Sequence, residues 1–319
     1  MSWPRISIVL PVFNCEATIA RALDSIVAQD YPALELILMD GASTDGTLEM
    51  AKRYESRFSH FVSEPDKGQT HALNKGFGLA SGEIFAWLCG DDAYQPGALK
   101  HVAETFAGDP TANMVIGTSR RVYADGSEQV LPLRPGLMER IGYHNGIDQP
   151  SAFWTASLHR AAGLLDEEMQ IGMDWDWWCR LRAAGAQVSL TERELSYYYF
   201  PEDSKTSAAP EGNLQAMYKV VKTYGPLDGR LADIYLRLYR DFDLKGCYDS
   251  PPSAPKWLQL RWAATLLWLY ARYGRDLIAA YNWTWCARQA RGLLWHEARP
   301  HLSAGAFLAN LLSLPQKPF

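Results

Sequence analysis

Several features that define common protein classes are scarce or missing in this chain of 319 residues. Positive charge is not in excess, because the formal net charge is −5, whereas a nucleic-acid-binding protein would usually show a basic footprint. The five cysteines are odd in number and form no C-x-x-C pair, so neither a structural zinc site nor a disulfide framework is indicated. Reduced thiols in a cytoplasmic protein are the simple interpretation.

A glycine-rich nucleotide loop is also missing. A dinucleotide-binding domain would carry G-x-G-x-x-G between its first strand and first helix, but the loop here, 11–16, contains no glycine. Gly76-x-Gly78 lies at the end of a helical pattern rather than after a strand, and there is no P-loop motif. Any diphosphate is therefore expected to be held by a metal ion rather than by a glycine cradle.

Long hydrophobic runs are absent too. The run 6–13 lacks a basic leader beyond Arg5 and contains Pro11, so it is predicted to be the first strand rather than a signal peptide. The apolar stretch 262–270 is far shorter than the ~20 residues that a membrane-spanning helix needs.

Strand and helix patterns alternate through the first hundred residues. Continuous β-branched runs indicate buried strands, and apolar residues at helical spacing lie between them. The predicted strands are 6–12, 34–39, 61–63 and 84–88, and the predicted helices are 17–29, 47–54 and 70–79. This rhythm predicts an α/β fold with a mostly parallel sheet flanked by helices, in which ligands bind at the carboxyl ends of the strands.

Polar clusters follow four of these strands. They are 14–16, 40–45, 64–69 and the pair Asp91-Asp92. Adjacent carboxylates repel each other, and Mg²⁺ or Mn²⁺ relieves the repulsion by binding carboxylate oxygens together with substrate phosphates. The alternative for Asp91-Asp92 is a solvated turn before a helix, since Asp, Pro and Gly favour both.

Linked motifs in this order resemble the family-2 glycosyltransferases of the GT-A fold. They are Ser7-Ile8-Val9-Leu10-Pro11-Val12-Phe13-Asn14, Asp40-Gly41-Ala42-Ser43-Thr44-Asp45-Gly46, Asp91-Asp92, Gln149-Pro150-Ser151, and Met173-Asp174-Trp175-Asp176-Trp177-Trp178. The resemblance implies a Rossmann-like nucleotide-sugar-binding half at 1–105 and an acceptor-binding half at 106–200. A helical C-terminal region is expected at 201–319.

The resemblance also implies an activity, the inverting, metal-dependent transfer of a hexose from a nucleotide diphosphate sugar, UDP-linked by resemblance alone. The expected acceptor is a hydroxyl of a glycan or lipid-linked molecule in surface polysaccharide or glycoconjugate synthesis. Two alternatives remain open. A sugar nucleotidyltransferase would show a Gly-rich, Arg-containing loop after the first strand, which this chain lacks. The other is a nucleotide-binding membrane scaffold without catalysis.

Site residues follow from the resemblance one position at a time. The residues matched to nucleotide-sugar binding are Pro11, Phe13, Glu16, Asp40, Lys67, Gln69, Asn74 and Asp91. Three of them have ordinary alternatives: Asp40 as a helix cap, Lys67 as an exposed lysine in a turn, and Asn74 as a structural group.

The metal ligands and the general base are also carried over. Asp92 is matched to the metal ligand and Asp91 to metal or ribose, although Gly90 replaces the first acid of the D-x-D motif. Asp174 is matched to the base that takes the proton of the acceptor hydroxyl, typically a ~10²–10⁴-fold effect. Its alternative is an N-cap of a helix over 175–184, and Asp176 is interpreted as structural, holding a cap or Arg180.

The C-terminal region changes in composition. Residues 256–301 carry seven Lys or Arg against two Asp or Glu, together with six of the twelve tryptophans. Basic, Trp-rich amphipathic helices are typical of an anionic membrane surface, so we expect a cytoplasmic protein that is peripheral on the inner face of the membrane. The alternative is a helical subdomain packed on the catalytic domain or on a second subunit.

Overall fold

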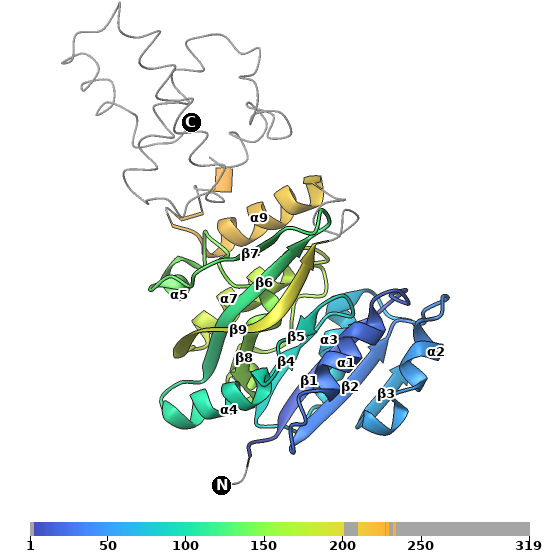
Figure 1. Ribbon diagram of the computed structural model, residues 1–319. Coiled ribbons are helices and arrows are strands. Elements are labelled where there is room, and N and C mark those ends of the chain that lie inside the picture. The colour runs from blue at the N-terminus through green and yellow to red at the C-terminus, as the bar shows by residue number, and fades with distance from the viewer. Residues whose placement is uncertain (1–2, 201–209, 227, 230–231, 234–319) are drawn as a thin grey trace, which may run out of the picture. The chain divides into compact units, whose positions relative to one another are not determined.

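The computed structural model describes residues 3–200, 210–226, 228–229 and 232–233 (Figure 1). The chain divides into two compact units, Met1–Ile141 with Gly146–Ala216, and Gly142–Asn145 with Met217–Phe319. Every predicted site residue lies in the first unit. The predicted domain boundaries at 105 and 200 stay predictions.

The first unit is built on one nine-stranded sheet. Its strand order is β3-β2-β1-β4-β8-β6-β9-β5, with β7 paired to β6. The strands are β1 (Ile6–Val12), β2 (Leu34–Asp40), β3 (His60–Ser63), β4 (Ile84–Trp87), β5 (Ala93–Tyr94), β6 (Met114–Tyr123), β7 (Glu128–Val130), β8 (Ala152–Thr155) and β9 (Val188–Phe200).

The predicted parallel half is present. β1 pairs in parallel with β2 and β4, and β2 pairs in parallel with β3, so the carboxyl ends of four strands meet at one edge. Pro11 faces Met39 on β2 and lies beyond Val9, the last β1 residue paired with β4. Its missing N–H therefore removes no bond from the β4 ladder. The α/β class is confirmed.

The second half of the sheet is mixed. β8 runs antiparallel to both β4 and β6, whereas β9 runs parallel to β6 and antiparallel to the two-residue β5. The sequence signal for the last strand is the aromatic run 197–200, but β9 begins at Val188. The longer strand is polar at its start, where Thr191, Glu192 and Arg193 leave no buried-strand pattern.

Helices cover both faces of the sheet (Figure 1). On one face, Ile8 and Leu10 of β1 share a buried cluster with residues of α1 and α4. On the other face, α3 lies against Val9 and Met39, and a Cβ added at Gly76 would be 2.4 Å from Val9 Cγ1. The α-helices of this unit are α1 (Ile19–Val27), α2 (Thr47–Lys52), α3 (Gln69–Leu79), α4 (Ala98–Gly108), α5 (Leu137–Arg140), α6 (Ala156–Ala162) and α7 (Met173–Ala183).

An aromatic cluster fills the second half of the core. Trp177 and Trp178 are fully buried, and Trp178 stacks on Trp87 with ring centroids 5.6 Å apart. Trp154 packs edge-on against Trp87 and Trp178. These two tryptophans of α7 therefore belong to the core.

Short 3₁₀ turns lie at Glu55–Arg57 and Gln149–Ser151. Helix α9 (Pro210–Tyr224) comes after the last strand in the sequence, and the boundary between the two units falls within it, after Ala216. Within the second unit, Tyr218 Oη and Lys222 Nζ donate to the carboxylate of Asp233 at 2.9 and 2.7 Å. Among the described residues, no helix is both long enough and apolar enough to cross a membrane. The basic, Trp-rich stretch 256–301 lies outside the described residues.

Candidate active site

The loops after β1 and β2 form one hydrogen-bonded unit. Asn14, at a φ of 48°, donates its N–H to Ser43 Oγ at 2.9 Å and accepts from Thr44 N–H at 2.8 Å. Glu16 accepts from Gly46 N–H at 2.9 Å through its carboxylate. These bonds follow from the parallel pairing of the two strands, which ends both loops at the same edge. The side chain of Phe13 beside them is 63% exposed.

Asp40 ends β2 and is 2% exposed. Its carboxylate accepts from Ser43 N–H at 3.1 Å and from Ser63 Oγ at 2.7 Å. It does not cap α2, whose first residue, Thr47, donates instead to Asp45 at 3.0 Å. Asp40 thus joins the ends of β2 and β3, and its contact with the nucleoside stays a prediction.

The loop before α3 lies beside Asp40. A Cβ at Gly41 would be 2.7 Å from Asp66 Oδ2, and Asp66 also accepts from Gly68 N–H at 2.7 Å. The exposed Lys67 is held through its backbone, because its N–H donates to His71 and its carbonyl accepts from Gln170. Its ammonium group is accordingly accessible to a negatively charged ligand.

Asn74 is bound to another part of the chain. It is 9% exposed, and its Nδ2 donates to Leu165 O at 3.0 Å and to Glu167 Oε1 at 3.1 Å. Its Oδ1 accepts from Leu165 N–H at 3.0 Å. These bonds tie α3 to the loop that leads into α7, so the structural interpretation accounts for its side chain.

Asp91 and Asp92 lie in the crossing from β4 to β5. The preceding Gly90 packs against Cys15, since an added Cβ would be 2.8 Å from Cys15 Sγ, and this contact explains the glycine in place of the first acid. Asp92 is 1% exposed and accepts from the N–H of Tyr199, in β9, at 3.1 Å. The loop is thereby fixed to the second half of the sheet.

Arg21 of α1 holds the same loop from the other side. Its Nη2 donates to Asp91 O at 2.6 Å, and its guanidinium lies 3.6 Å from the centre of the Tyr199 ring. Such a stacked cation stabilises the ring's position as well as the loop. Helix α1 and strand β9 therefore both position the acidic pair.

Asp92 is buried beside a second carboxylate. Burial, followed by the charge of Asp91, raises the pKa of Asp92 well above its ordinary value, and the Tyr199 N–H and Arg21 lower it less. Within the described ranges, Cys89, Asp91 and Asp92 are the one group of three potential metal ligands, with ligand atoms within 4.8 Å of one another. A divalent cation fits this set, because it would neutralise carboxylates that burial and mutual repulsion disfavour.

Asp174 lies in the first turn of α7. The helix begins at Met173 after Gly172, which has a φ of 66°, so Asp174 is not the N-cap that the alternative interpretation assumed. A carboxylate at this position is stabilised by the helix dipole. Asp176 is buried and accepts from Arg180 Nε at 2.6 Å, which confirms the structural interpretation of that residue.

The hydroxyl of Tyr198, in β9, is affected by the charges of both Asp92 and Asp174. Burial raises the pKa of its hydroxyl well above the ordinary value, and the charges of Asp92 and Asp174 add to the effect, followed by Asp148 and Cys89. Asp92 and Asp174, from separate segments, thus both raise the pKa of one tyrosine hydroxyl. Asp40 ends β2, which lies two strands away from β4 in the sheet.

The sequence interpretation missed Tyr198, Arg21 and the pair formed by Arg121 and Asp148. Arg121 Nη2 lies 2.6 Å from Asp148 Oδ1, directly before the Gln149-Pro150-Ser151 motif. The signal that could have found Tyr198 is strand alternation, because the adjacent residues Tyr197 and Tyr198 point to opposite faces of the sheet. The contacts of Arg21 with Asp91 and of Arg121 with Asp148 join residues far apart in the sequence, so no local pattern indicates them.

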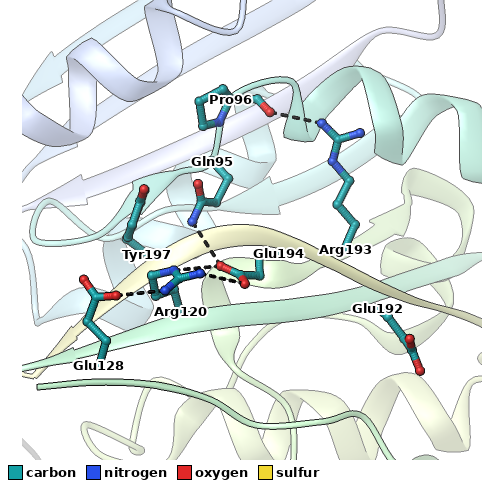
Figure 2. A pocket seen from close by; sticks show the side chains of 8 residues that line it. All are labelled: Gln95, Pro96, Arg120, Glu128, Glu192, Arg193, Glu194 and Tyr197. Atoms are coloured by element: carbon teal, nitrogen blue, oxygen red, sulfur yellow. Dashed lines mark hydrogen bonds and ion pairs between the residues drawn. The ribbon is translucent and has the colours of Figure 1, made fainter.

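A separate polar cavity of about 540 Å³ lies between β6, β7 and β9 (Figure 2). Arg120 spans it and pairs with Glu128 and Glu194, each at 2.8 Å, and Arg193 donates to Pro96 O. Tyr197 lines this cavity, and strand alternation directs its neighbour Tyr198 to the opposite face of β9. None of the predicted site residues lines it.

Comparison with known proteins agrees with this geometry. Residues 7–161 match the model of Glycosyl transferase family 2, a range that includes the four strand ends and Asp91-Asp92. Residues 7–161 are therefore similar to family-2 glycosyltransferases, the fold is GT-A-like, and the resemblance seen in the motifs is confirmed. Asp174 lies beyond the matched range.

Named relatives share this domain. The putative glycosyltransferase EpsE of Bacillus subtilis is 35% identical over 149 residues, which is 44% of this chain and 53% of EpsE. A PGL/p-HBAD biosynthesis glycosyltransferase of Mycobacterium bovis is 29% identical over 184 residues, 56% of this chain and 69% of the relative. The match thus spans little more than half the length of EpsE.

Solved structures with the same fold extend over more of the chain. S. aureus TarS 1–349 in complex with UDP-GlcNAc gives a TM-score of 0.58 at 17% identity, covering 93% of this chain and 91% of that one. The mannosyltransferase PcManGT from Pyrobaculum calidifontis, in complex with GDP-Man and Mn²⁺, gives 0.57 at 18% identity, covering 98% and 81%. At these identities the likeness shows the fold.

Proposed function

We propose that this domain transfers a hexose from a nucleotide diphosphate sugar to a hydroxyl of a glycan or lipid-linked acceptor, with inversion and with a divalent cation. The observation that carries the proposal is the group of Cys89, Asp91 and Asp92 at the end of β4, whose potential ligand atoms lie within 4.8 Å of one another. A diphosphate bound at this group would meet an acceptor hydroxyl deprotonated by Asp174, a residue whose charge acts on Tyr198 together with that of Asp92.

The chemistry needs one displacement. Asp174 takes the proton of the acceptor hydroxyl, whose oxygen attacks the anomeric carbon while the bond from that carbon to the diphosphate breaks. Attack opposite the leaving group inverts the anomeric centre. Asp91 and Asp92 would hold Mg²⁺ or Mn²⁺, which supplies neutralisation of the leaving diphosphate when bound. Strand β9 and Arg21 keep the acidic pair in place.

The donor class is supported by the solved structures of similar fold. TarS is described with UDP and UDP-GlcNAc, and PcManGT with GDP-Man and Mn²⁺. The loops after β1, β2 and β3 would bind the nucleoside through Pro11, Phe13, Glu16 and Asp40. Lys67, Gln69, Asn74 and Asp91 are assigned to the rest of the donor, and uridine follows from the motif resemblance.

A donor panel with Mn²⁺ tests the activity. Release of nucleoside diphosphate from a nucleotide sugar is expected, together with a product of inverted anomeric configuration by NMR. Release of pyrophosphate would support a sugar nucleotidyltransferase instead. Absence of turnover with every donor and acceptor would favour a non-catalytic scaffold.

Asp92→Asn tests the metal assignment. The variant is expected to lose cation-dependent donor binding, because one of two adjacent carboxylates is removed. Calorimetric titration of Mn²⁺ with and without UDP measures this loss. Asp109→Asn is a matched control, since Asp109 accepts only local bonds from Thr111 and Ala112 at the end of α4. An unchanged Mn²⁺ affinity in Asp92→Asn would refute the ligand role.

Asp174→Asn tests the base. Donor affinity is expected to stay within about threefold, whereas kcat should fall ~10²–10⁴-fold because an amide cannot take the acceptor proton. Single-turnover transfer and donor titration on the same sample separate the two effects. Near-normal turnover would remove Asp174 from the mechanism.

We also propose that the chain attaches peripherally to the inner, anionic face of the membrane, in surface polysaccharide assembly. The composition of residues 256–301, with seven basic residues and six tryptophans, supports this proposal. A lipid-linked acceptor would then be presented at the same surface.

A further inference from the structure

Cys89 directly precedes the glycine and the acidic pair. Its Sγ, one oxygen of Asp91 and one oxygen of Asp92 all lie within 4.8 Å of one another. Ligand atoms roughly 2.0–2.6 Å from one ion lie no more than about 5 Å apart. The sulfur is thus within the span of a single coordination sphere shared with both carboxylates.

Asp92 independently indicates that a ligand belongs here. It is 1% exposed, and the part of the chain that the structure describes gives its carboxylate one hydrogen bond, from Tyr199 N–H. A buried carboxylate with a single donor and a second carboxylate beside it is unfavourable unless a cation binds. This requirement arises from burial and hydrogen bonding, not from the spacing of the three groups.

The sulfur is also held in position. Gln69 Nε2 donates to Cys89 Sγ at 3.1 Å. The Cys89 thiol in turn donates to Gln149 Oε1, which lies 3.5 Å from Sγ. Gln149 is fixed in turn, because its Nε2 donates to Trp87 O at 2.8 Å. Side chains from α3 and the 149–151 turn therefore orient the sulfur, as outer groups commonly orient metal ligands.

We propose that Cys89 Sγ is a third protein ligand of the cation held by Asp91 and Asp92, which makes this a mixed sulfur–oxygen site. The inference rests on the proposed function. Binding transfers the thiol proton to solvent and changes no oxidation state. Thiolate favours softer ions such as Zn²⁺, Cd²⁺ and Co²⁺, whereas Mg²⁺ favours oxygen alone. The site therefore discriminates between cations through one side chain.

Cobalt gives a direct spectroscopic test. Co²⁺ added to the full-length chain with UDP is expected to produce a near-ultraviolet thiolate-to-cobalt charge-transfer band. Cys89→Ser should remove the band, whereas Cys15→Ser should retain it. Cys15 is a matched control, because its Sγ would lie 2.8 Å from a Cβ at Gly90 and it is not one of the three grouped ligands. A band that persists in Cys89→Ser would overturn the inference.

Competition provides a second measurement. Cys89→Ser should weaken Cd²⁺ binding at least about tenfold, the loss that even an outer partner of a metal ligand produces. Mg²⁺ binding should change by less than about threefold, because hydroxyl and carboxylate oxygens still suit that ion. Equal losses for both ions would contradict a sulfur-specific role.

The outcomes separate this inference from the proposed function. Co²⁺ binding that depends on Asp92 but gives no charge-transfer band would overturn the role of Cys89 and leave the metal-dependent transferase intact. Absence of binding by Co²⁺, Mn²⁺ and Mg²⁺, with and without UDP, would overturn both. Circular dichroism of Cys89→Ser shows whether a lost band reflects the ligand or the fold.

Discussion

At the scale of single residues, Asn74 makes three hydrogen bonds to the loop before α7. Asn74→Ala should leave the N–H and carbonyl of Leu165 without these partners and lower the free energy of unfolding by ~1–3 kcal/mol. Chemical denaturation measures this change, and donor titration of the same variant tests the predicted donor contact. Unchanged stability with weaker donor binding would favour the donor role over the structural one.

His159 is a second residue whose surroundings determine its behaviour. It is 7% exposed, accepts from Trp154 Nε1 through Nδ1, and lies 4.6 Å from the centre of Phe77. Burial, with a smaller effect of Arg160, lowers its pKa from 6.5 to about 4. The histidine is therefore neutral in the folded state at neutral pH.

Acidification should consequently destabilise the fold through His159. Below pH 6.5 His159 takes up a proton in the unfolded chain, whereas in the folded chain it stays neutral until the pH falls to about 4. The free energy of unfolding therefore decreases as the pH falls across that interval. The contribution is about 2 kcal/mol between pH 7.5 and 5. His159→Gln keeps an acceptor for Trp154 and does not titrate, so its urea midpoint should fall less over this range. Parallel curves for the two proteins would contradict the assignment.

At the scale of elements, α3 contains two glycines in different surroundings. A Cβ at Gly76 would meet Val9 Cγ1 at 2.4 Å and Met39 Cγ at 3.0 Å, whereas a Cβ at Gly78 would meet nothing within 4 Å. Gly76→Ala should cost ~1–3 kcal/mol by forcing α3 off the sheet. Gly78→Ala should raise the free energy of unfolding by up to about 1 kcal/mol, because alanine favours the helix at this exposed position of α3. Thermal denaturation that shifts both variants in one direction would refute this account.

The parallel half of the sheet could be predicted because its signals are local. Strand 6–12 was predicted with the bounds observed for β1, and the apolar run at 34–39 ends one residue before β2 does. Each of these strands is buried on both faces and therefore has a continuous apolar sequence.

The second half carried no such signal. β5 has two residues, too few for a periodic pattern. The antiparallel pairing of β8 with β4 depends on contacts between residues about 70 positions apart. For the same reason, the sequence supplied Asp91, Asp92 and Asp174 as separate motifs but did not supply Tyr198, whose pKa is raised by the charges of Asp92 and Asp174.

At the scale of the whole molecule, the C-terminal stretch is predicted to bind anionic membranes. Truncation after Pro255 removes six tryptophans and seven basic residues of the stretch 256–301. The full chain should sediment with anionic vesicles and dissociate at high salt, whereas the truncated chain should remain in the supernatant. Neutral vesicles are the control. A full chain that never sediments with anionic vesicles would refute the prediction.

The bond between Asp92 and β9 has a consequence for divergence within such proteins. Its donor is the main-chain N–H of Tyr199, so any residue except proline at that position can supply it. A chimaera that exchanges the acceptor half for that of a relative would keep the anchor whatever side chains it imports. Side chains of β9 that select the acceptor could therefore be substituted without loss of the main-chain hydrogen bond that positions Asp92.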